Sequence, residues 1–349
     1  MAPGRPRAPY DRCVRLGFSI GYAPPGTNPT ELIALAQEAE RLGFDSAWAA
    51  EAWGTDAVTV LAWLGATTSR IGLGSCVMQI AARSPAATAM TAATLDLMSG
   101  GRFRLGLGVS GPQVVEGWHG EPWTRPLTRT REYVDVVRAA VRRERLVYDG
   151  ERYQIPFRGP GATGLGKPLK LMLRPVRSEI PIYLAAIRPR AVELAVEIAD
   201  GWLPFFFVPE RARHVFGAVL ERAPADFDVA PTAPLVMTDD VPTGLEALKP
   251  FYALYVGGMG AHHTNFYNDL MARYGYEEEA RRIQELYLAG RHRDAAAAVP
   301  DRFVDEAALV GPKARLAARL DEWREAGVTT LICSTRQVEA MRAAAELVL

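Results

Sequence analysis

The sequence has little cysteine and no excess of either charge. Among 349 residues the three cysteines are Cys13, Cys76 and Cys333, which lie far apart and form neither a CxxC pair nor the cysteine and histidine spacing of a zinc site. Lysine plus arginine equals aspartate plus glutamate at 40 each, so the net charge indicates neither nucleic acid nor an anionic membrane as partner. We therefore expect a small-molecule substrate, no nucleic-acid partner and a reducing, cytoplasmic setting.

Long hydrophobic runs and metal motifs are also missing. The first residues, MAPGRPRAPYDRCVR, carry charge and proline but lack the apolar segment of a signal peptide, and no stretch is apolar enough to cross a bilayer. His262 and His263 form a pair without a third ligand at metal spacing, so we predict no metal site. The expected protein is soluble, with no membrane partner.

What is present is a repeated alternation of strand and helix patterns. Residues 14–21 form a short apolar run, followed by Asn28 as a helix N-cap, Pro29 at the first helical position and Glu31 at the capping-box position. Further strands are expected at 44–51, 70–78, 102–109, 180–187, 201–207, 228–237 and 328–335, and further helices at 56–68, 85–98, 130–143, 189–198, 209–222, 312–326 and 336–349.

The strands read as nearly continuous apolar or small runs, which is typical of a parallel sheet covered by helices. Eight strand and helix alternations predict an α/β fold of the TIM (β/α)8 barrel type, with residues 1–349 as a single domain. Two insertions are expected at about 111–179, with a hairpin around Asp149-Gly150, and at about 244–311, which begins as a long helical segment.

The fourth predicted strand runs into LGVSGPQVVEGWHG, and the carboxyl ends of barrel strands are where ligands bind. Gly106, Gly108, Ser110 and Gly111 have small or absent side chains, so a planar heterocycle could lie against the main chain there. No P-loop lysine follows, which favours a ring over a phosphate as the group bound. The alternative is that the glycines only turn a tight corner of the barrel.

Several motifs carry a family resemblance. GFDSAWAAE, RIGLGSCV, TLDLMSGGRFRLGLGVSG, PIYLAA and EIADGWLP resemble, in order and spacing, the bacterial luciferase-like flavin and deazaflavin oxidoreductases. They are most similar to the branch that uses coenzyme F420 and includes methylenetetrahydromethanopterin reductase. The resemblance covers nearly the whole chain and is weakest at the N-terminal tail and at 244–291. It implies a TIM barrel, a homodimer, a tricyclic ring bound at the strand ends, and a cis peptide bond between Cys76 and Val77.

The resemblance also implies a carboxylate near the ring, at Glu51. Enclosed by Trp48, Trp53 and apolar neighbours, this carboxylate would have a raised pKa and act as a catalytic acid or base. The alternative is a glutamate that binds loop amides. The glucose-6-phosphate dehydrogenase of the same branch has histidine where this chain has Ala52, which argues against a sugar phosphate as substrate.

Two further catalytic candidates, Glu116 and His119, flank Trp118 in the loop after the fourth strand, where they could bring a proton donor over the ring or serve as structural hydrogen bonders. Trp53, Trp118, Trp123 and Phe206 are predicted to wall the substrate pocket. The predicted cofactor-binding residues are Ser19, Ser75, Cys76, Val77, Ser110, Gly111, Ala185, Ala186, Ile187, Arg188 and Trp202.

Within that set, Arg188 precedes a helix whose N-terminal amides could hold the cofactor's phosphodiester. Lys167, Lys170, Arg174 and Arg177 could meet an acidic glutamate tail or could simply be solvated.

Three functions remain open on the sequence. The first is an F420-dependent oxidoreductase that transfers a hydride between the deazaflavin C5 and a small organic substrate. The second is an FMN-dependent monooxygenase on the same barrel. The third is a flavin-binding protein without catalytic activity.

Overall fold

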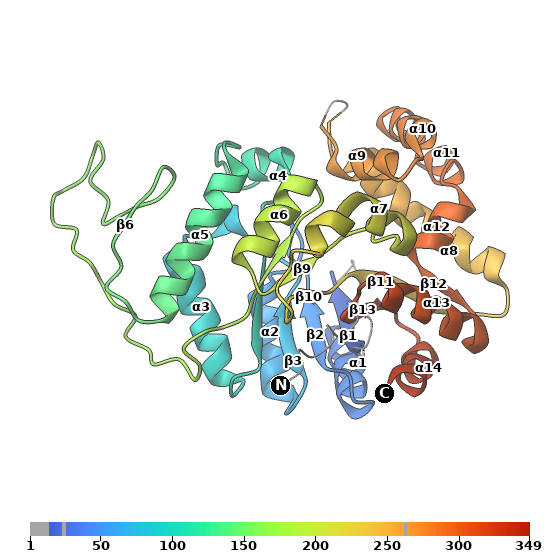
Figure 1. The fold of residues 1–349 in the computed structure, drawn as a ribbon, viewed down its shortest axis with the longest axis horizontal. Coiled ribbons are helices and arrows are strands. Elements are labelled where there is room, and N and C mark those ends of the chain that lie inside the picture. The colour runs from blue at the N-terminus through green and yellow to red at the C-terminus, as the bar shows by residue number, and fades with distance from the viewer. Residues whose placement is uncertain (1–13, 23–25, 262–263) are drawn as a thin grey trace, which may run out of the picture.

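The computed structural model describes residues 14–22, 26–261 and 264–349, so Cys13 and the His262–His263 pair lie outside the described residues. Within them the predicted barrel is confirmed (Figure 1). Its sheet consists of β1 (Arg15–Gly21), β2 (Ser46–Ala49), β3 (Gly72–Ser75), β4 (Met78–Gln79), β5 (Phe103–Gly108), β8 (Ile182–Ala185), β9 (Gly201–Leu203), β10 (Asp228–Val229), β11 (Thr232–Met237), β12 (Leu309–Gly311) and β13 (Thr330–Ser334).

Residues 228–237 close the barrel. In this segment β10 pairs with β9 while β11 pairs with β13, and β13 in turn pairs with β1, all in parallel. With β3 and β4 counted as one strand position, and β10 and β11 as another, the described strands occupy the eight positions of a (β/α)8 ring. The short β12 adds to the outer side of β11. All strands of the ring therefore end on the same side.

Helices surround the ring, and several begin with the capping chemistry that the sequence indicates. Asn28, Asp56 and Ser84 each accept a hydrogen bond from an amide of the following helix. Glu31 contacts the Asn28 side chain at 3.5 Å, whereas a capping box would place it on the Asn28 backbone. The helices that follow the strands are α1 (Pro29–Arg41), α2 (Ala57–Thr67), α3 (Pro85–Met98), α5 (Pro126–Val141), α6 (Pro189–Ile198), α7 (Pro209–Leu220), α13 (Lys313–Glu325) and α14 (Val338–Val348).

Two segments depart from the strand and helix rhythm. The first carries the short α4 (Pro112–Gly117) and, after α5, the hairpin of β6 (Tyr148–Asp149) and β7 (Gln154–Ile155), which projects away from the barrel in Figure 1. The second is helical and comprises α8 (Val241–Ala253), a π-helical turn η2 (Leu254–Gly258), α9 (Phe266–Arg273), α10 (Glu277–Leu288), α11 (His292–Ala297) and α12 (Asp301–Ala307).

The predicted strands at 70–78 and 228–237 are each divided in two. In the first, β3 and β4 are separated at Cys76–Val77, where the peptide bond is cis as the resemblance implied. In the second, the division falls at Ala230 and Pro231, whose ring removes a ladder donor. The short elements α4, α12 and β12 were not predicted.

The barrel interior is filled by large side chains. Trp48 and Tyr183 are nearly fully buried and meet edge to face, with ring centroids 5.3 Å apart. Gly74 makes room for this indole, because a Cβ there would lie 2.1 Å from Trp48. Any ligand must therefore bind above this packed interior, at the ends of the strands. Among the described helices, none combines the length and the apolar character that a bilayer span would need.

Candidate active site

A cavity of about 780 Å³ lies where the strands end. Residues that follow β1, β2, β4, β5, β8 and β9 line it, and the helical insertion contributes further residues from η2 and α9. This is the position at which TIM barrels bind their ligands. Of the predicted site residues, those that line the cavity are Glu51, Trp53, Cys76, Val77, Ser110, Gly111, Ala185, Ala186, Ile187 and Arg188.

The floor of the cavity is formed by the close approach of β5 to residues 75–77. A Cβ on Gly106 would lie 1.8 Å from the Ser75 carbonyl oxygen, and a Cβ on Gly108 would lie 2.5 Å from the Val77 side chain. Gly106 therefore serves the packing of β5 on β3, while Gly108, Ser110 and Gly111 line the cavity itself. Ser110 adopts φ 61, an uncommon value for a residue other than glycine.

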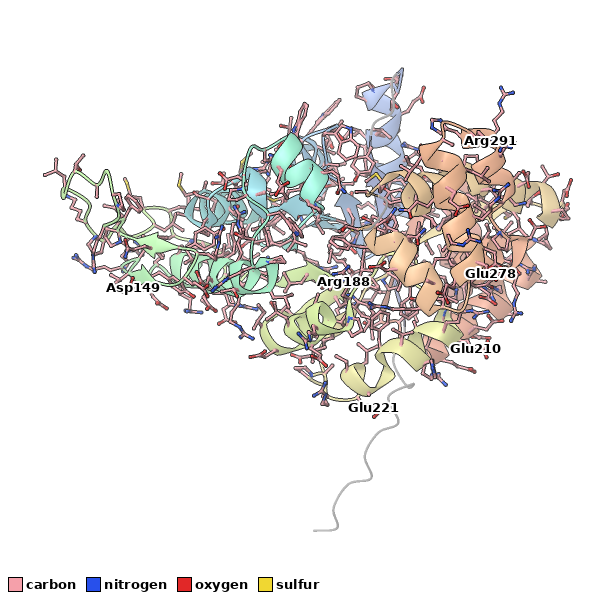
Figure 2. All side chains as sticks on the ribbon, turned by 90° about the horizontal axis from the view of Figure 1, so that it is seen from above. Asp149, Arg188, Glu210, Glu221, Glu278 and Arg291 are labelled. Atoms are coloured by element: carbon pink, nitrogen blue, oxygen red, sulfur yellow. The ribbon has the colours of Figure 1, made fainter. Side chains whose placement is uncertain are left out.

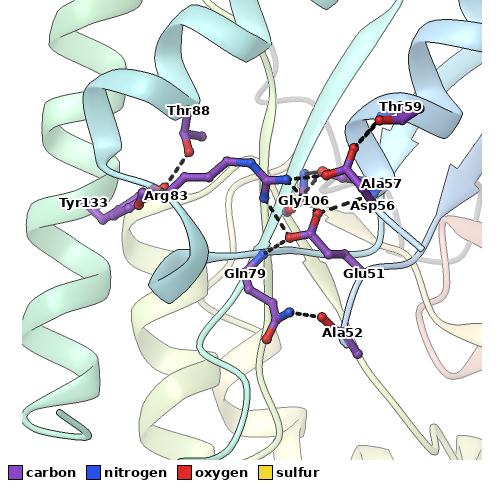
Figure 3. Close-up of polar contacts among 11 residues, drawn as sticks. Glu51, Ala52, Asp56, Ala57, Thr59, Gln79, Arg83, Thr88, Gly106 and Tyr133 are labelled. Atoms are coloured by element: carbon purple, nitrogen blue, oxygen red, sulfur yellow. Dashed lines mark hydrogen bonds and ion pairs between the residues drawn. The ribbon is translucent and has the colours of Figure 1, made fainter. Parts of the chain in front are cut away.

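Glu51 lies at the cavity wall in a network of polar contacts (Figure 3). Its two carboxylate oxygens accept hydrogen bonds from both terminal nitrogens of Arg83, at 2.7 and 2.9 Å. They also accept the backbone amides of Ala57, at 3.3 Å, and Gln79, at 3.2 Å. A third bond from Arg83 reaches Asp56 at 2.5 Å. The network joins the end of β2 to the chain between β4 and α3.

The surroundings of Glu51 therefore differ from the apolar enclosure expected from the sequence. Its side chain is 7% exposed, but the guanidinium of Arg83 faces it across a bidentate contact. The sequence does not predict this partner, because Arg83 lies 32 residues from Glu51 and its position just before the N-cap Ser84 indicates only a helix start. The amide contacts match the alternative interpretation of Glu51 as a residue that binds loop amides.

Gln79 carries an unusual polar atom at the cavity. Its side-chain nitrogen donates to the Ala52 carbonyl at 2.7 Å, which fixes the orientation of the amide. The opposite atom, Oε1, is buried and has no hydrogen-bond partner among the described residues. Since buried polar atoms are normally paired, this acceptor indicates a place for a donor supplied by a ligand.

Aromatic side chains form much of the remaining wall. Trp53 and Trp123 line the cavity, as the sequence predicts. The helical insertion adds Phe266, whose ring centroid is 6.2 Å from that of Trp123. The sequence predicts that the Phe205 to Phe207 cluster and the segment 252–269 shape the substrate site, and Phe205, Tyr255, Met259 and Tyr267 line the cavity. Tyr22 also lines it and was not predicted. The many aromatic residues in 251–267 indicate an apolar wall, but which of them reach the cavity depends on how the insertion folds back over the strand ends.

Three arginines line one side of the cavity. Arg188 is the N-cap of α6, pairs with Asp269 at 2.8 Å and lies 4.7 Å from the centre of the Phe266 ring. Figure 2 shows Arg188 between Asp149 of the β6–β7 hairpin and Glu278 of the helical insertion. Arg190 and Arg273 also line the cavity, and neither has an ion-pair partner within the described part of the chain. The cavity therefore offers positive charge at this side.

The other predicted cofactor and substrate residues do not line the cavity. Ser75 is fully buried and exchanges hydrogen bonds with the backbone of Gly106, while Ser19 lies within β1. Trp202 is buried and donates to the Ala186 carbonyl at 2.9 Å, so it holds the backbone of Ala186, which lines the cavity. Phe206 is 4% exposed and packs among Tyr252, Phe303 and other rings.

Glu116, His119 and Trp118 are likewise outside the lining of the cavity. Glu116 accepts a hydrogen bond from the Trp123 amide at 3.3 Å, and Trp118 is 65% exposed. His119 buries a ring nitrogen that has no partner among the described residues. Arg177 binds the buried Asp96, which is a structural role, and Lys167, Lys170 and Arg174 are not among the residues lining the cavity.

Comparison with known proteins gives consistent matches. Residues 15–330 match the family model described as luciferase-like monooxygenase. A Mycobacterium tuberculosis protein named as a provisional coenzyme F420-dependent oxidoreductase is 46% identical over 96% of this chain and 99% of its own. The 5,10-methylenetetrahydromethanopterin reductase of Archaeoglobus fulgidus is 29% identical over 91% of this chain and 93% of its own.

Among solved structures, the coenzyme F420-dependent tetrahydromethanopterin reductase of Methanopyrus kandleri superposes with a TM-score of 0.80. It covers 96% of this chain and 98% of its own at 23% identity, which is evidence for the shared fold.

Proposed function

The chain belongs to the luciferase-like monooxygenase family. From this premise we propose that it is an F420-dependent oxidoreductase, which transfers a hydride between C5 of the deazaflavin and a small organic substrate. The relatives named for F420 support the cofactor and the reaction class. The observation that carries the proposal is the large cavity at the strand ends, with main chain at its floor and aromatic side chains in its walls.

The residues of the cavity fit a deazaflavin. The floor at Cys76, Val77 and Gly108 offers a surface for a flat ring, and the buried acceptor of Gln79 suits a ring N–H, which F420 carries in its pyrimidine portion. The cations at the other side, Arg188, Arg190 and Arg273, suit the phosphodiester and the carboxylates of the tail. When bound, F420 supplies a two-electron hydride carrier.

The chain's own residues would bind, orient and shield the reacting groups. The first turn of α6 begins with Pro189, which has no N–H, and the amides of Ala191 and Val192 already donate to the Arg188 carbonyl. The helix would therefore contribute the positive end of its dipole, on the same side as Arg188. Aromatic residues from the insertion exclude water above the floor, which strengthens polar interactions inside the cavity. Glu51, held by Arg83 and two amides, positions the β2 and β4 ends, so its contacts support a positioning role over the predicted acid–base role.

We also propose that the protein forms a homodimer through α2 and α3. Met90, Leu97 and Met98 of α3 recur at helical spacing and are 58%, 45% and 64% exposed. Trp63 of the neighbouring α2 is 46% exposed. Exposed apolar side chains grouped on neighbouring helices are typical of an interaction site. We call these four residues the α2–α3 face, which lies on two helices in contact with each other that a second copy could match.

Fluorescence titration of the purified protein with F420 and, separately, with FMN tests the cofactor. We expect saturable F420 binding and no tight FMN binding. Tight binding of FMN without affinity for F420 would instead favour an FMN-dependent monooxygenase. Binding of either cofactor without turnover on a panel of ketones, enones, imines and alcohols would favour a flavin-binding protein without catalytic activity.

A further inference from the structure

The helical insertion holds one arginine of the cavity by two different contacts. Nη2 of Arg188 donates to Oδ2 of Asp269 at 2.8 Å. The guanidinium carbon of Arg188 also lies over the ring of Phe266, 4.7 Å from its centre. Both partners belong to α9, whereas Arg188 precedes α6. The two contacts therefore fix the guanidinium relative to the wall that the insertion adds to the cavity.

One face of α9 is turned toward the start of α6. Phe266, Asp269 and Arg273 are three and four residues apart, so they lie on the same side of this helix. Phe266 and Arg273 line the cavity, and Asp269 between them pairs with Arg188. Arg190, two residues beyond Arg188, lines the cavity from α6. The cations of the two helices therefore meet at one side of the cavity.

Hydrogen bonds anchor α9 to the rest of the insertion. Asn265, the N-cap of α9, is 3% exposed and accepts two amides of the helix. Its side-chain nitrogen donates to the carbonyls of Tyr255 and Val256 in η2, at 3.0 and 2.9 Å. Asn268 donates to the Ala280 carbonyl of α10 at 2.7 Å. Since α9 has a fixed place, the two side chains that hold Arg188 are fixed with it.

The contacts of Arg188 leave positive charge and N–H groups for a ligand. The hydrogen bond to Asp269 uses a single N–H group of the guanidinium, and stacking on Phe266 uses none. Arg190 and Arg273 have no ion-pair partner among the described residues. Asp269 therefore balances one of three cations, and this side of the cavity suits an anionic group.

We propose that Phe266 and Asp269 are positioning residues, which hold the Arg188 guanidinium in place for the phosphodiester of F420. The proposal rests on the proposed F420-dependent function and assigns to α9 part of the affinity for the anionic half of the cofactor. A mobile arginine loses rotamer freedom when it binds an anion, whereas Arg188 is already ordered by its two contacts. Neither positioning residue has to touch the phosphodiester.

The charge of Asp269 has a second, opposite effect. A carboxylate beside the phosphodiester repels it, so Asp269 both orders Arg188 and disfavours the bound anion. The side chains of Arg188 and Asp269 are 50% and 41% exposed, and solvent and salt screen a repulsion at such a position. We therefore expect the ordering of Arg188 to be the larger of the two effects.

Fluorescence titrations with F420 and with ribityl deazaflavin, which has the same ring but no phosphodiester or carboxylate, test the proposal. The affinity for F420 divided by that for ribityl deazaflavin measures what the anionic half contributes. We expect this ratio to fall about 20-fold in Arg188→Met, as for loss of a charged hydrogen bond. It should fall about threefold in Phe266→Leu and in Asp269→Ala. Retained binding of ribityl deazaflavin shows that the cavity of each variant is folded.

Two further comparisons separate positioning from a general structural role. In the Arg188→Met background, Phe266→Leu should leave the ratio unchanged, because it acts only through Arg188. Phe266→Tyr keeps a ring for stacking and Asp269→Asn keeps an acceptor, so both should retain most of the wild-type ratio.

Tyr276→Leu is the matched control. The guanidinium of Arg211 lies 4.6 Å from the centre of the Tyr276 ring and pairs with Glu306, which is the same arrangement among residues that do not line the cavity. This variant should keep the wild-type ratio.

A higher ratio in Asp269→Ala would overturn the proposal, because repulsion would then outweigh ordering. An equal effect of Phe266→Leu with and without Arg188, or an effect no larger than that of Tyr276→Leu, would also overturn it. A wild type that does not bind F420 would contradict the proposed function itself, whereas F420 binding with unchanged ratios would contradict only the positioning by α9.

Discussion

At the scale of single residues, the unpaired Oε1 of Gln79 makes a testable prediction about cofactor binding. Gln79→Met removes the acceptor while keeping the length of the side chain, so we expect F420 affinity to fall about tenfold, as for an unsatisfied ring N–H in a buried site. Fluorescence titration measures this. Gln284→Met is the control, since Gln284 is also buried but lies outside the cavity. Equal F420 affinities for the two variants would contradict the assignment.

The pair of Glu51 and Arg83 predicts a large effect on stability. Arg83→Met leaves a carboxylate that is 7% exposed without its counter-charge, so we expect the free energy of unfolding to fall by about 3 kcal/mol. Chemical denaturation monitored by circular dichroism measures it. The double variant Glu51→Gln with Arg83→Met should recover part of the loss, because no buried charge remains.

Arg281→Met, which breaks an exposed pair with Glu285, should change the stability by less than about 1 kcal/mol. Equal losses in both arginine variants would refute the positioning role of the network.

At the scale of helices and strands, the sequence predicted most of what local rules govern. The helices at 85–98 and 189–198 have the predicted bounds. Each begins with a proline, and Ser84 caps the first, signals that act within one turn. The division of the strand at 70–78 came from the resemblance, not from the residues. The partners of Glu51 and the place of Tyr22 in the lining could not be predicted, because both depend on contacts between segments far apart in the chain.

The opposite end of the barrel gives a prediction about pH. Asp45, just before β2, accepts hydrogen bonds from Arg104 of β5 at 2.5 and 3.2 Å, with Gly72 of β3 packed between them. Burial alone would raise the pKa of Asp45, but the hydrogen bonds and the charge of Arg104 outweigh it, so the pKa is lowered. A carboxylate with a lowered folded-state pKa stabilises the fold above its unfolded pKa of about 4, and this contribution is lost as the pH falls through the folded value.

We therefore expect the Tm of the wild type to fall on acidification below about pH 4 more steeply than that of Asp45→Asn. In Arg104→Met the buried carboxylate loses its partner, so its pKa should rise, and protonation on acidification should relieve the cost of the buried charge. The Tm of this variant should therefore be lower than that of the wild type at neutral pH and fall less steeply on acidification. Thermal unfolding of the three proteins between neutral and acidic pH measures both effects. Parallel Tm profiles for all three would show that the Asp45–Arg104 contact does not link β2 to β5 in this way.

At the scale of the whole molecule, the α2–α3 face and the projecting β6–β7 segment are two candidate places for contact with a second copy. The segment after β7 also exposes apolar side chains, including Leu165 and Met172 at 85% and 93%. The α2–α3 face differs in that its apolar residues belong to regular helices packed on the barrel, so two copies can meet there without ordering a loop.

We expect the wild type to have twice the monomer mass by light scattering coupled to size exclusion. Met90→Glu should shift it to the monomer mass, because a charge on the exposed Met90 position would be buried in the proposed interface. Met172→Glu, the same substitution on the projecting segment, should remain dimeric. The reverse pattern would assign the interface to the projecting segment, and a monomeric wild type would refute the dimer. None of the residues of the α2–α3 face lines the cavity, so monomeric Met90→Glu should still bind F420, which separates assembly from cofactor binding.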